Sequence, residues 1–505
     1  MPTLPIKTTA PGVANSLDED AQVPLLGLVI LWSKSQPQCV GEVALLPPFE
    51  RRFVGRGGVE IEKFVQFGQH RPGGYVPVDP HEGLLTGESI SGRQLIVCAT
   101  AAKIEVESVG RCVMLVNGVE TKSASLEPGD TLMLQGELLL RCVRREAVLP
   151  SPPGGFIPAF GEPDAVGIVG ESAAVWELRT HLYAAARTKG HVYLQGESGT
   201  GKELAARAIH QGSPRASGPY VAHNSSSSTS SLLEWQLFGN LKNCPNQGMP
   251  ARKGIVPSAD GGTLFLDEIG DLTPEAQAQL LRVIACGECL PVGGDVPQRV
   301  DVRFVAATNK PESVLRSDLP ARFLVNVRVP PLRERAEDIP LIARQWILEH
   351  ASERPEEARR FIYAGPSGRP EVRISARLIE HLVREPPPLN VRGLHKLLWV
   401  AMQGSTGDKV RLPKAFATAV SAASMPSTPA PAAAPSAAPP GRRPPPSTQP
   451  PEQADSDSPS KEQILARLAM ERGNVTRAAK ALGLERSALY RRMRRYGIAQ
   501  EEPEP

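Results

Sequence analysis

The sequence predicts a multi-domain chain with an N-terminal all-β sandwich, a central α/β domain carrying a helical lid, and a C-terminal all-α domain. Short apolar or alternating runs, separated by Gly, Pro and Asp, fill residues 21–148 and are typical of a sandwich. From residue 166, strand-like runs alternate with helical ones, which predicts a parallel sheet covered by helices. Residues 461–498 have the apolar spacing of three short helices. A chain of 505 residues is too long for one core.

Composition limits the classes of protein. The 57 basic and 54 acidic residues nearly balance, so the net charge indicates no partner. Cys286 and Cys289 form a lone Cys-x-x-Cys, and a structural zinc site needs four ligands, so reduced thiols are expected. The apolar run Val23 to Trp32 is too short to span a bilayer, and the start lacks the features of a signal peptide. We therefore expect a cytoplasmic protein without a membrane partner.

The sandwich, residues 21–148, has its expected strands at Leu25–Trp32, Gln94–Ala99, Lys103–Val106, Cys112–Val116, Thr131–Gln135 and Leu138–Val143. Its loops and turns carry Gly55-Arg56, Ser91-Gly-Arg93, Val116-Asn-Gly118 and Leu126-Glu-Pro-Gly-Asp130. The order and spacing of these motifs resemble a forkhead-associated (FHA) domain, a fold whose loops bind phosphothreonine. The resemblance implies that Arg56 and Ser91 bind the phosphate of a phosphothreonine protein, as an arginine fork beside a hydroxyl can do.

Two positions depart from the FHA pattern. The usual serine-arginine-x-histidine reads Ser91-Gly-Arg-Gln94, and the expected asparagine falls at about Cys112. A working phosphopeptide reader and a sandwich that has lost its ligand therefore remain open. Asn117-Gly118 is interpreted as a hairpin turn rather than a ligand contact.

Residues 149–165 are expected to be a linker, and residues 166–333 form the α/β core. An apolar strand ending at Leu194 and a helix over Leu204–His210 enclose Gly196-x-x-x-x-Gly201-Lys202. Glycines let such a loop curl so that backbone N–H groups and the helix N-terminus surround a polyphosphate, which the lysine also reaches. The context of strand and helix predicts a nucleotide site.

A second motif supports this site. The strand-like run before Asp267 and Glu268 ends in two acids. Next to a phosphate-binding loop, Asp267 would hold Mg²⁺ through water and Glu268 would orient or deprotonate the attacking water.

Residues 166–412 resemble the AAA+ domain of bacterial sigma-54-dependent (NtrC-like) transcriptional activators. The matching motifs are Gly-Glu-Ser-Gly-Thr-Gly-Lys-Glu at 196–203, Gly-Gly-Thr-Leu-Phe-Leu-Asp-Glu-Ile-Gly at 261–270, Pro291–Asp295, Ala306–Asn309 and Pro330–Arg335. The resemblance implies ATP as substrate, hydrolysed in a ring, and assigns nucleotide binding to Gly196, Glu197, Ser198, Gly199, Thr200, Gly201, Lys202 and Glu203. It also implies that Asn224 restrains Glu268, that Asn309 is the first sensor and Arg392 the second, and that Arg316 and Arg322 reach a neighbour's nucleotide.

One departure concerns the output of this domain. After Leu237-Phe-Gly239 the family places the loop Gly-Ala-Phe-Thr-Gly-Ala, which contacts sigma-54, whereas this chain reads Asn243-Cys-Pro-Asn-Gln-Gly248. Pro245 is expected to stiffen the loop. On the lid, Pro386-Pro-Pro-Leu-Asn replaces the usual Trp-Pro-Gly-Asn.

The C-terminal part divides into a helical lid at 334–423, a Pro/Ala-rich linker at 424–460 and a basic domain at 461–498. The basic domain resembles the Fis-type helix-turn-helix that closes many members of the same activator family. Its third helix would enter the major groove of DNA. The candidate DNA contacts are Arg486, Ser487, Arg491 and Arg492.

Three functional hypotheses follow. The first is an ATP-hydrolysing regulator, bound to DNA upstream of promoters or at enhancers, that acts on sigma-54 RNA polymerase as a homo-oligomer, from dimer to hexamer. The second keeps DNA and ATP binding without remodelling that polymerase, as a repressor, a regulator of another polymerase form or a member of a mixed ring. The third is a phosphopeptide-dependent adaptor with a vestigial ATPase.

Overall fold

The computed structural model describes residues 24–413 apart from 59, 78–83, 153–156, 228–229, 245, 311–313 and 367, together with Leu489. The chain divides into two compact units, Met1–Met425 and Pro426–Pro505. In the second unit only Leu489 is described; it is helical and buried. The predicted helix-turn-helix and its DNA contacts otherwise lie outside the described residues.

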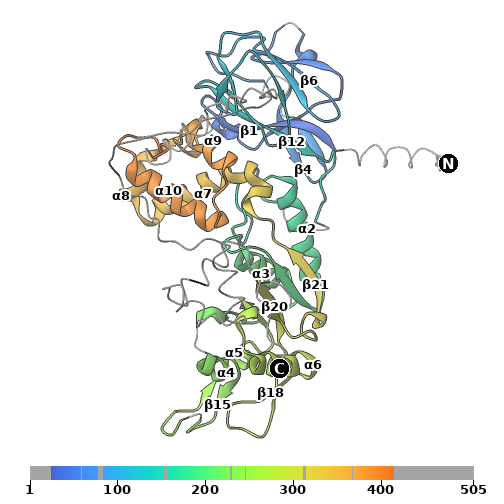
Figure 1. The fold of residues 1–505 in the computed structure, drawn as a ribbon, viewed down its shortest axis with the longest axis vertical. Coiled ribbons are helices and arrows are strands. Elements are labelled where there is room, and N and C mark those ends of the chain that lie inside the picture. The colour runs from blue at the N-terminus through green and yellow to red at the C-terminus, as the bar shows by residue number, and fades with distance from the viewer. Residues whose placement is uncertain are drawn as a thin grey trace, which may run out of the picture. The chain divides into compact units, whose positions relative to one another are not determined.

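The N-terminal sandwich consists of two sheets that enclose one core (Figure 1). The larger sheet has the order β5-β4-β2-β1-β12-β11-β8-β9 and the smaller has the order β10-β7-β6-β3. Their strands are β1 (Leu25–Ser33), β2 (Val43–Leu45), β3 (Arg51–Val54), β4 (Gly68–Arg71), β5 (Gly74–Pro77), β6 (Leu95–Ala99), β7 (Ile104–Ser108), β8 (Met114–Val116), β9 (Val119–Glu120), β10 (Ser123–Leu126), β11 (Thr131–Leu134) and β12 (Leu138–Arg145). The predicted strands lie within one or two residues of these bounds.

The hairpin predicted at Asn117-Gly118 is confirmed. Asn117 and Gly118 have φ angles of 51° and 80°, and the flanking Val116 and Val119 pair with each other. Two successive positive φ angles define the tight turn that matches strand twist, and Asn-Gly is its preferred sequence.

The central domain is a parallel sheet with the order β14-β17-β20-β13-β21. Its strands are β13 (His191–Gln195), β14 (Tyr220–Asn224), β17 (Thr263–Asp267), β20 (Arg303–Thr308) and β21 (Phe323–Arg328), and its main helices are α2 (Ala173–Arg187), α3 (Lys202–Gln211), α4 (Ser230–Phe238) and α6 (Pro274–Cys286). Successive residues of β20 pack on opposite faces of the sheet. Phe304 belongs to one hydrophobic core and Val305 to another. Burial on both faces explains why β13, β17 and β20 read as largely continuous apolar runs.

The lid contains α7 (Ile339–Glu353), α8 (Pro355–Ala358), α9 (Ala376–Arg384) and α10 (Asn390–Gly404), coloured yellow to orange in Figure 1. The Ser375 hydroxyl accepts a hydrogen bond from Leu378 N and so caps α9. The sequence predicted only helices here, and this was wrong for β22 (Ile362–Ala364) and β23 (Pro370–Val372), which form a hairpin. Gly368, at φ 75°, lies in the connecting turn.

Among the described residues, no helix combines the length and the hydropathy that crossing a membrane requires.

Candidate nucleotide site and its surroundings

The predicted phosphate-binding loop, residues 196–201, lies between β13 and α3. Gly199 and Gly201 have φ angles of 77° and 103°, which side chains rarely adopt. A Cβ at Gly199 would lie 2.3 Å from the Leu389 carbonyl oxygen of the lid. Glycine is therefore required at this position for two reasons, the backbone conformation and the close approach of the lid.

Lys202 begins α3 and folds back over this loop. Its Nζ donates to the carbonyl oxygens of Gly196, at 3.0 Å, and Glu197, at 3.3 Å, and the residue is only 6% exposed. Thr200 Oγ1 also donates to Glu197 O, at 2.8 Å. A buried ammonium group and a helix N-terminus thus share one small region, which favours an anion there. Glu203, where the generic motif has Ser or Thr, pairs on the surface with Arg207 at 2.8 Å.

The predicted acidic and amide residues meet at the carboxyl edge of the sheet. Asn224 and Asp267 are register partners at the ends of β14 and β17. Glu268 follows with a φ of 54°, and its Oε2 accepts a hydrogen bond of 3.2 Å from Asn309 N, just after β20. Since β13 pairs with β20 in the same parallel sheet, the loop at 196–201 leaves from this edge too. Ligands of open α/β sheets bind at this edge.

Asn224 has a local role as well. Its Oδ1 accepts hydrogen bonds from Ser226 N, at 2.9 Å, and Ser226 Oγ, at 2.7 Å. The carboxamide therefore caps the short helix η3 (Ser225–Ser227), while the backbone register keeps it beside Asp267.

The lid is tied to the phosphate-binding loop by Asn390 and Arg392 at the start of α10. Asn390, at φ 52° and buried, donates from Nδ2 to Ser198 O (3.0 Å) and Glu197 Oε2 (3.2 Å). Its Oδ1 accepts from Leu332 N at 2.7 Å. Arg392 Nη1 donates to Ser198 Oγ at 3.1 Å, so the predicted lid arginine does reach the loop. The hydrogen bond from Asn390, followed by the contact with Arg333, lowers the pKa of Glu197.

A second buried contact comes from η7 (Leu332–Asp338), which begins at the leucine of the Pro-Pro-Leu-Arg-Glu-Arg motif at 330–335. Arg335 is 4% exposed and donates from Nη2 to Thr200 O at 2.9 Å. Beside it, Asp338 accepts hydrogen bonds from Glu171 N, Ser172 N and Ser172 Oγ. These contacts fix the start of α2 and the phosphate-binding loop to one segment.

Arg316 and Arg322, the two predicted finger arginines, are exposed. Arg316 pairs with Asp318 at 3.3 Å, and this contact lowers the pKa of the Asp318 carboxyl. Arg322 ends the short helix η6 (Pro320–Arg322). Neither side chain makes a hydrogen bond or ion pair with residues 196–203 among the described contacts.

The segment that replaces the family's Gly-Ala-Phe-Thr-Gly-Ala loop folds back on itself. It lies between β15 (Gly239–Asn240) and β16 (Arg252–Lys253), and Pro245 is outside the described residues. Asn240 is 2% exposed, and its Nδ2 lies 2.9 Å from each of the carbonyl oxygens of Leu241, Cys244 and Pro250.

The same loop is braced against a second one. Leu241 N donates to Val292 O, and a Cβ at Gly293 would lie 2.3 Å from Cys244 Sγ. The loop is therefore a compact turn held by a buried amide and by the segment at 291–294.

In the sandwich, the loops that carry Arg56 and Ser91 touch each other. Arg56 N donates to Ser91 O at 3.2 Å, and a Cβ at Gly55 would lie 2.1 Å from Gly92 O. Ser91 Oγ accepts from Arg111 N at 3.0 Å, which brings a third loop to the same place. The structure therefore places Arg56 and Ser91 together.

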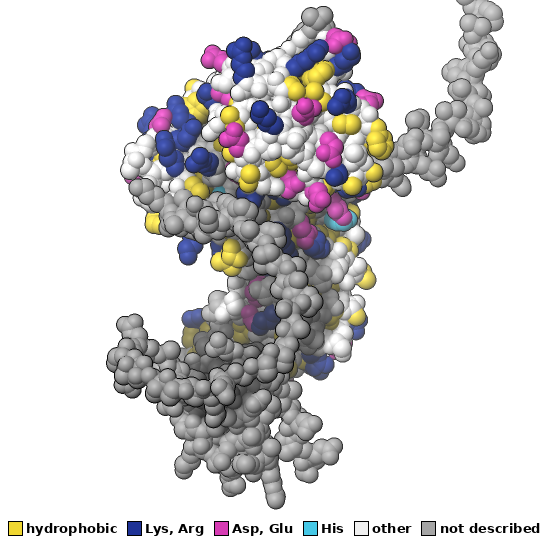
Figure 2. All heavy atoms as spheres, turned by 45° about the horizontal axis from the view of Figure 1, so that its top comes forward, with side chains coloured by type: hydrophobic (Ala, Val, Ile, Leu, Met, Phe, Trp, Pro, Cys, Tyr) yellow, Lys and Arg dark blue, Asp and Glu magenta, His cyan; other side chains and the backbone are white. Residues whose placement is uncertain are grey.

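Gln94, which stands where the FHA pattern has histidine, is fully buried and organises these loops. Its Oε1 accepts from Ser91 N and Cys112 N, and its Nε2 donates to Cys112 O at 2.9 Å. On the face of the sandwich visible in Figure 2, basic and acidic side chains are interspersed.

The roles of Asn390, Arg335, Gln94 and Arg111 are not predicted by the sequence. Asn390 and Arg335 lie in segments that had been matched to the family, but nothing in their spacing showed that they contact residues 197–200. Gln94 was noted only as a departure. A polar residue next to an apolar strand start, Leu95, was the one available signal of a buried amide.

The fold and this arrangement of loop, carboxylates and lid define an AAA+ ATPase domain. Residues 168–325 match the family Sigma-54 interaction domain, and residues 460–496 match the Fis family of bacterial regulatory proteins. The chain is 34% identical to the anaerobic nitric oxide reductase transcription regulator NorR of Klebsiella pneumoniae (strain 342) over 382 residues, 73% of this chain and 69% of the relative. The chain therefore belongs to the family of sigma-54-dependent DNA-binding transcriptional regulators.

Other relatives match over shorter stretches. The DNA-binding transcriptional regulator NtrC of Bradyrhizobium sp. (strain RP501 Parasponia) is 41% identical over 244 residues, 47% of this chain and 48% of that protein. The chain thus spans about half the length of the NtrC relatives it matches. Among solved structures, NtrX from Brucella abortus in complex with ADP has a TM-score of 0.44 and 27% identity, covering 66% of this chain and 70% of the other.

Proposed function

We propose that this chain is a DNA-binding regulator of transcription whose central domain binds and hydrolyses ATP. The observation that supports this best is the convergence of Lys202, Asp267, Glu268 and Asn309 at the carboxyl edge of one sheet. Phosphate-binding groups, a magnesium ligand and a candidate base are thus available within one region of the fold.

We assign a different role to each residue of this site. Lys202 and the N–H groups of residues 196–201 would bind the β- and γ-phosphates, and Asp267 would hold Mg²⁺, which proteins commonly bind through one or two carboxylates plus substrate phosphates. Glu268 would orient or deprotonate the attacking water, with Asn309 N fixing its carboxylate. Arg392 of the lid would contact the bound nucleotide, so that the position of the lid depends on nucleotide binding.

ATP hydrolysis is proposed to need a second copy of the chain. Arg316 and Arg322 are exposed and make no described contact with their own phosphate-binding loop. Offered to a neighbour's nucleotide, they would stabilise the charge of the transition state, as an arginine supplied in trans does. The homo-oligomer, from dimer to hexamer, would then be the active form.

For the output, the loop at 243–248 favours a second candidate: a regulator that binds DNA and ATP without remodelling sigma-54 RNA polymerase. Asn240 and the neighbouring loop at 291–294 hold this turn closed, and it lacks the family's phenylalanine and threonine. The described residues at its tip, Asn243 and residues 246–248, are exposed, so the loop lacks the family's side chains and not access to a partner.

The experiment that separates the two candidates is open-complex formation on a sigma-54 promoter with the purified full-length chain, measured beside ATPase activity. Melting of the promoter that requires ATP would support the remodelling activity. ATPase activity and DNA binding without melting would support the second candidate. A chain that neither binds nor hydrolyses ATP would contradict both.

The N-terminal sandwich is proposed to be an FHA domain that binds a phosphothreonine protein. The support is the contact among the loops of Arg56, Ser91 and Arg111, which leaves two exposed arginines beside a serine hydroxyl. Binding of a phosphothreonine peptide library, compared with its unphosphorylated form and with an Arg56→Ala variant, tests this. Equal binding of both forms would show that the sandwich has lost this ligand.

DNA binding is proposed to reside in residues 461–498. The match of residues 460–496 to the Fis family supports it, with Arg486, Ser487, Arg491 and Arg492 as the candidate contacts. If Arg491 contacts a phosphate, Arg491→Ala should weaken binding at all sequences and reduce its salt dependence.

A further inference from the structure

The central strand β1 of the larger sheet of the N-terminal sandwich is buried on both faces. On β1, Leu28 and Ile30 belong to the core of the sandwich, whereas their neighbours Val29 and Leu31 belong to a different core. All four are at most 2% exposed. A sandwich sheet normally has one apolar face and one polar face towards water. The outward face of this sheet must therefore have another partner.

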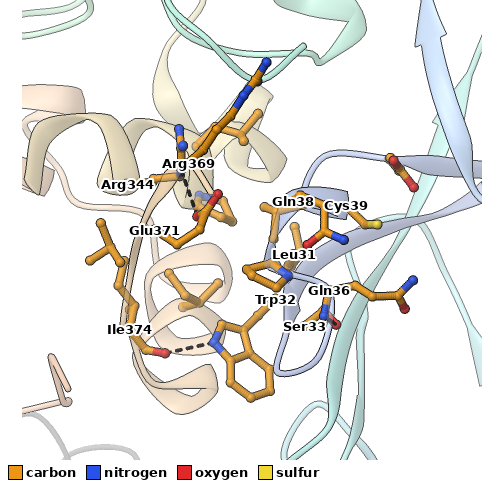
Figure 3. A pocket seen from close by; sticks show the side chains of 18 of the residues that line it. Leu31, Trp32, Ser33, Gln36, Gln38, Cys39, Arg344, Arg369, Glu371 and Ile374 are labelled. Atoms are coloured by element: carbon orange, nitrogen blue, oxygen red, sulfur yellow. Dashed lines mark hydrogen bonds and ion pairs between the residues drawn. The ribbon is translucent and has the colours of Figure 1, made fainter. Parts of the chain in front are cut away.

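That partner is the lid. The core that contains Val29, Leu31, Met133, Leu139 and Val143 also contains residues of α7, α9 and α10. In Figure 3, Trp32 of β1 points to the lid, and its Nε1 donates to Ile374 O at 2.8 Å. Glu371 and Arg344 of the lid, which pair at 3.0 Å, line the other side of the same pocket, whose volume is about 1060 Å³.

Polar contacts surround this apolar interface and concentrate on α9. Arg141 Nη1 donates to Val383 O at 3.2 Å, and Thr131 Oγ1 lies 3.1 Å from Glu380 Oε1. In the other direction, Arg384 Nη1 donates to Asn117 O at 2.8 Å. The C-terminal half of α9 is thus held by three separate parts of the sandwich.

A buried ion pair fixes a second lid segment. Arg145 Nη2 lies 2.8 Å from Glu337 Oε1, and the two side chains are 2% and 14% exposed. Buried charges are costly unless they remain paired, so this contact requires the sandwich to stay in place. Glu337 belongs to η7, the same segment whose Arg335 donates to Thr200 O.

Both lid segments held by the sandwich lead directly to the phosphate-binding loop. The chain leaves α9 at Arg384 and reaches Asn390 six residues later, where Val391 N donates to Gly199 O at 3.0 Å. Asn390 itself contacts Glu197 and Ser198. The sandwich and the nucleotide site are therefore connected by two short, packed routes, one through α9 and one through η7.

We propose that the N-terminal sandwich is a fixed partner of the lid and holds α9 and η7 against the phosphate-binding loop, so that nucleotide affinity depends on the docked sandwich. This rests on the proposed ATP binding. A ligand of the sandwich would then act by changing how the lid is held, not by releasing a freely tethered domain.

The test uses the full chain and two variants of one strand. Arg141 and Arg144 both lie on β12, but Arg141 donates to the lid whereas Arg144 donates to Ala101 O within the sandwich. We expect Arg141→Ala to accelerate hydrogen exchange of the α9 amides and to weaken binding of a fluorescent ATP analogue about fivefold, since a lost hydrogen bond costs about 1 kcal/mol. Arg144→Ala should change neither.

A stronger variant is Leu139→Glu, which puts a charge into the shared core, with Ile96→Glu on the outward face of the smaller sheet as its control. Circular dichroism checks that each variant is folded. We expect a larger rise of the dissociation constant for Leu139→Glu than for Arg141→Ala, and none for the control. Faster exchange in α9 with an unchanged dissociation constant would overturn the proposal, as would unchanged exchange in Leu139→Glu.

The same measurements separate this proposal from the proposed function. If the wild-type chain binds no ATP analogue, ATP binding is wrong and the affinity part of the inference falls with it, while the exchange of α9 still shows whether the sandwich is docked. If the wild-type chain binds and only the coupling is missing, the proposed function stands and the inference alone is wrong.

Discussion

The phosphate-binding loop with its lid and the loop between Asn240 and Pro250 belong to one α/β domain, and they differ in what their polar groups hold. At the first, Lys202, Asn390 and Arg335 each bond to the carbonyl oxygens of residues 196–200 from a different element. At the second, the described hydrogen bonds of the Asn240 side chain all stay within its own loop.

Within one family, the residues of the candidate nucleotide site and those of the loop at 243–248 are therefore retained to different degrees. In the nucleotide site, a change of any one group would disturb elements distant in sequence. The loop at 243–248, here called the output loop, makes few described contacts beyond the segment at 291–294. We therefore expect the candidate nucleotide site and the output loop to behave independently, and four sets of variants test this.

The largest effect is expected for Lys202→Ala. Removing the ammonium group should weaken ATP binding about 100-fold or more, since charge-assisted hydrogen bonds contribute roughly 1.5–3 kcal/mol each. Titration with a fluorescent ATP analogue measures this. Arg207→Ala, on the exposed side of α3, is the matched control and should bind as the wild type does. Equal affinities of the Lys202 variant and the wild type would remove the site from this loop.

The second-largest effect, expected for Glu268→Gln, distinguishes nucleotide binding from ATP hydrolysis. Glu268→Gln keeps the shape of the side chain and the acceptor for Asn309 N but removes the base, so ATP hydrolysis should fall by about 100-fold or more with affinity nearly unchanged. Steady-state ATPase and nucleotide titration on the same sample provide both numbers. Glu275→Gln, in the first turn of α6, serves as the control. Undiminished hydrolysis would exclude Glu268 as the base.

Part of the candidate nucleotide site can be predicted from the sequence. Local patterns predicted the loop after β13 and the two acids at the end of β17, and the family resemblance added Asn309 after β20; parallel strands deliver their carboxyl ends to one edge. Asn390 and Arg335 could not be assigned in this way. Their roles depend on how the lid packs on residues 197–200, 135 to 193 positions away, and spacing along the chain does not report such contacts.

The burial of the outer face of the sandwich could not be predicted either, because it also depends on contacts between distant parts of the chain. Alternation predicted its strands, and β1 was recognised as an apolar run. That both faces of β1 are buried follows only when α9 and the lid lie against it. The hairpin β22–β23 was missed for a local reason, because Arg, Gly and Pro around residues 365–370 give no alternating pattern.

A smaller effect is expected where the lid meets the loop. Asn390→Gly keeps the positive φ but removes three hydrogen bonds, one of them to a buried N–H, and should weaken ATP binding about tenfold and lower thermal stability. Asn390→Asp retains the acceptor for Leu332 N but replaces both donated hydrogen bonds by a buried carboxylate beside Glu197 Oε2 and Ser198 O. It should therefore lower both stability and ATP affinity at least as much as Asn390→Gly. If both variants bind ATP normally, the lid does not position the loop.

The smallest effect on the nucleotide site is expected from the output loop itself. Replacing Asn243–Gly248 by the family's Gly-Ala-Phe-Thr-Gly-Ala should leave ATP affinity and ATPase within about twofold, because distant sites with no shared contacts behave independently. The same variant should acquire ATP-dependent melting of a sigma-54 promoter if the loop alone limits the output. Cys244→Ser, which changes the contact with Gly293 but restores neither phenylalanine nor threonine, is the control.

If the variant with the replaced loop still melts no promoter while its ATPase activity is intact, the loop sequence alone does not limit the output. The contacts of Asn240 and residues 291–294 with the loop would then be the next feature to change. A fall in ATPase would instead show that the two regions are coupled after all.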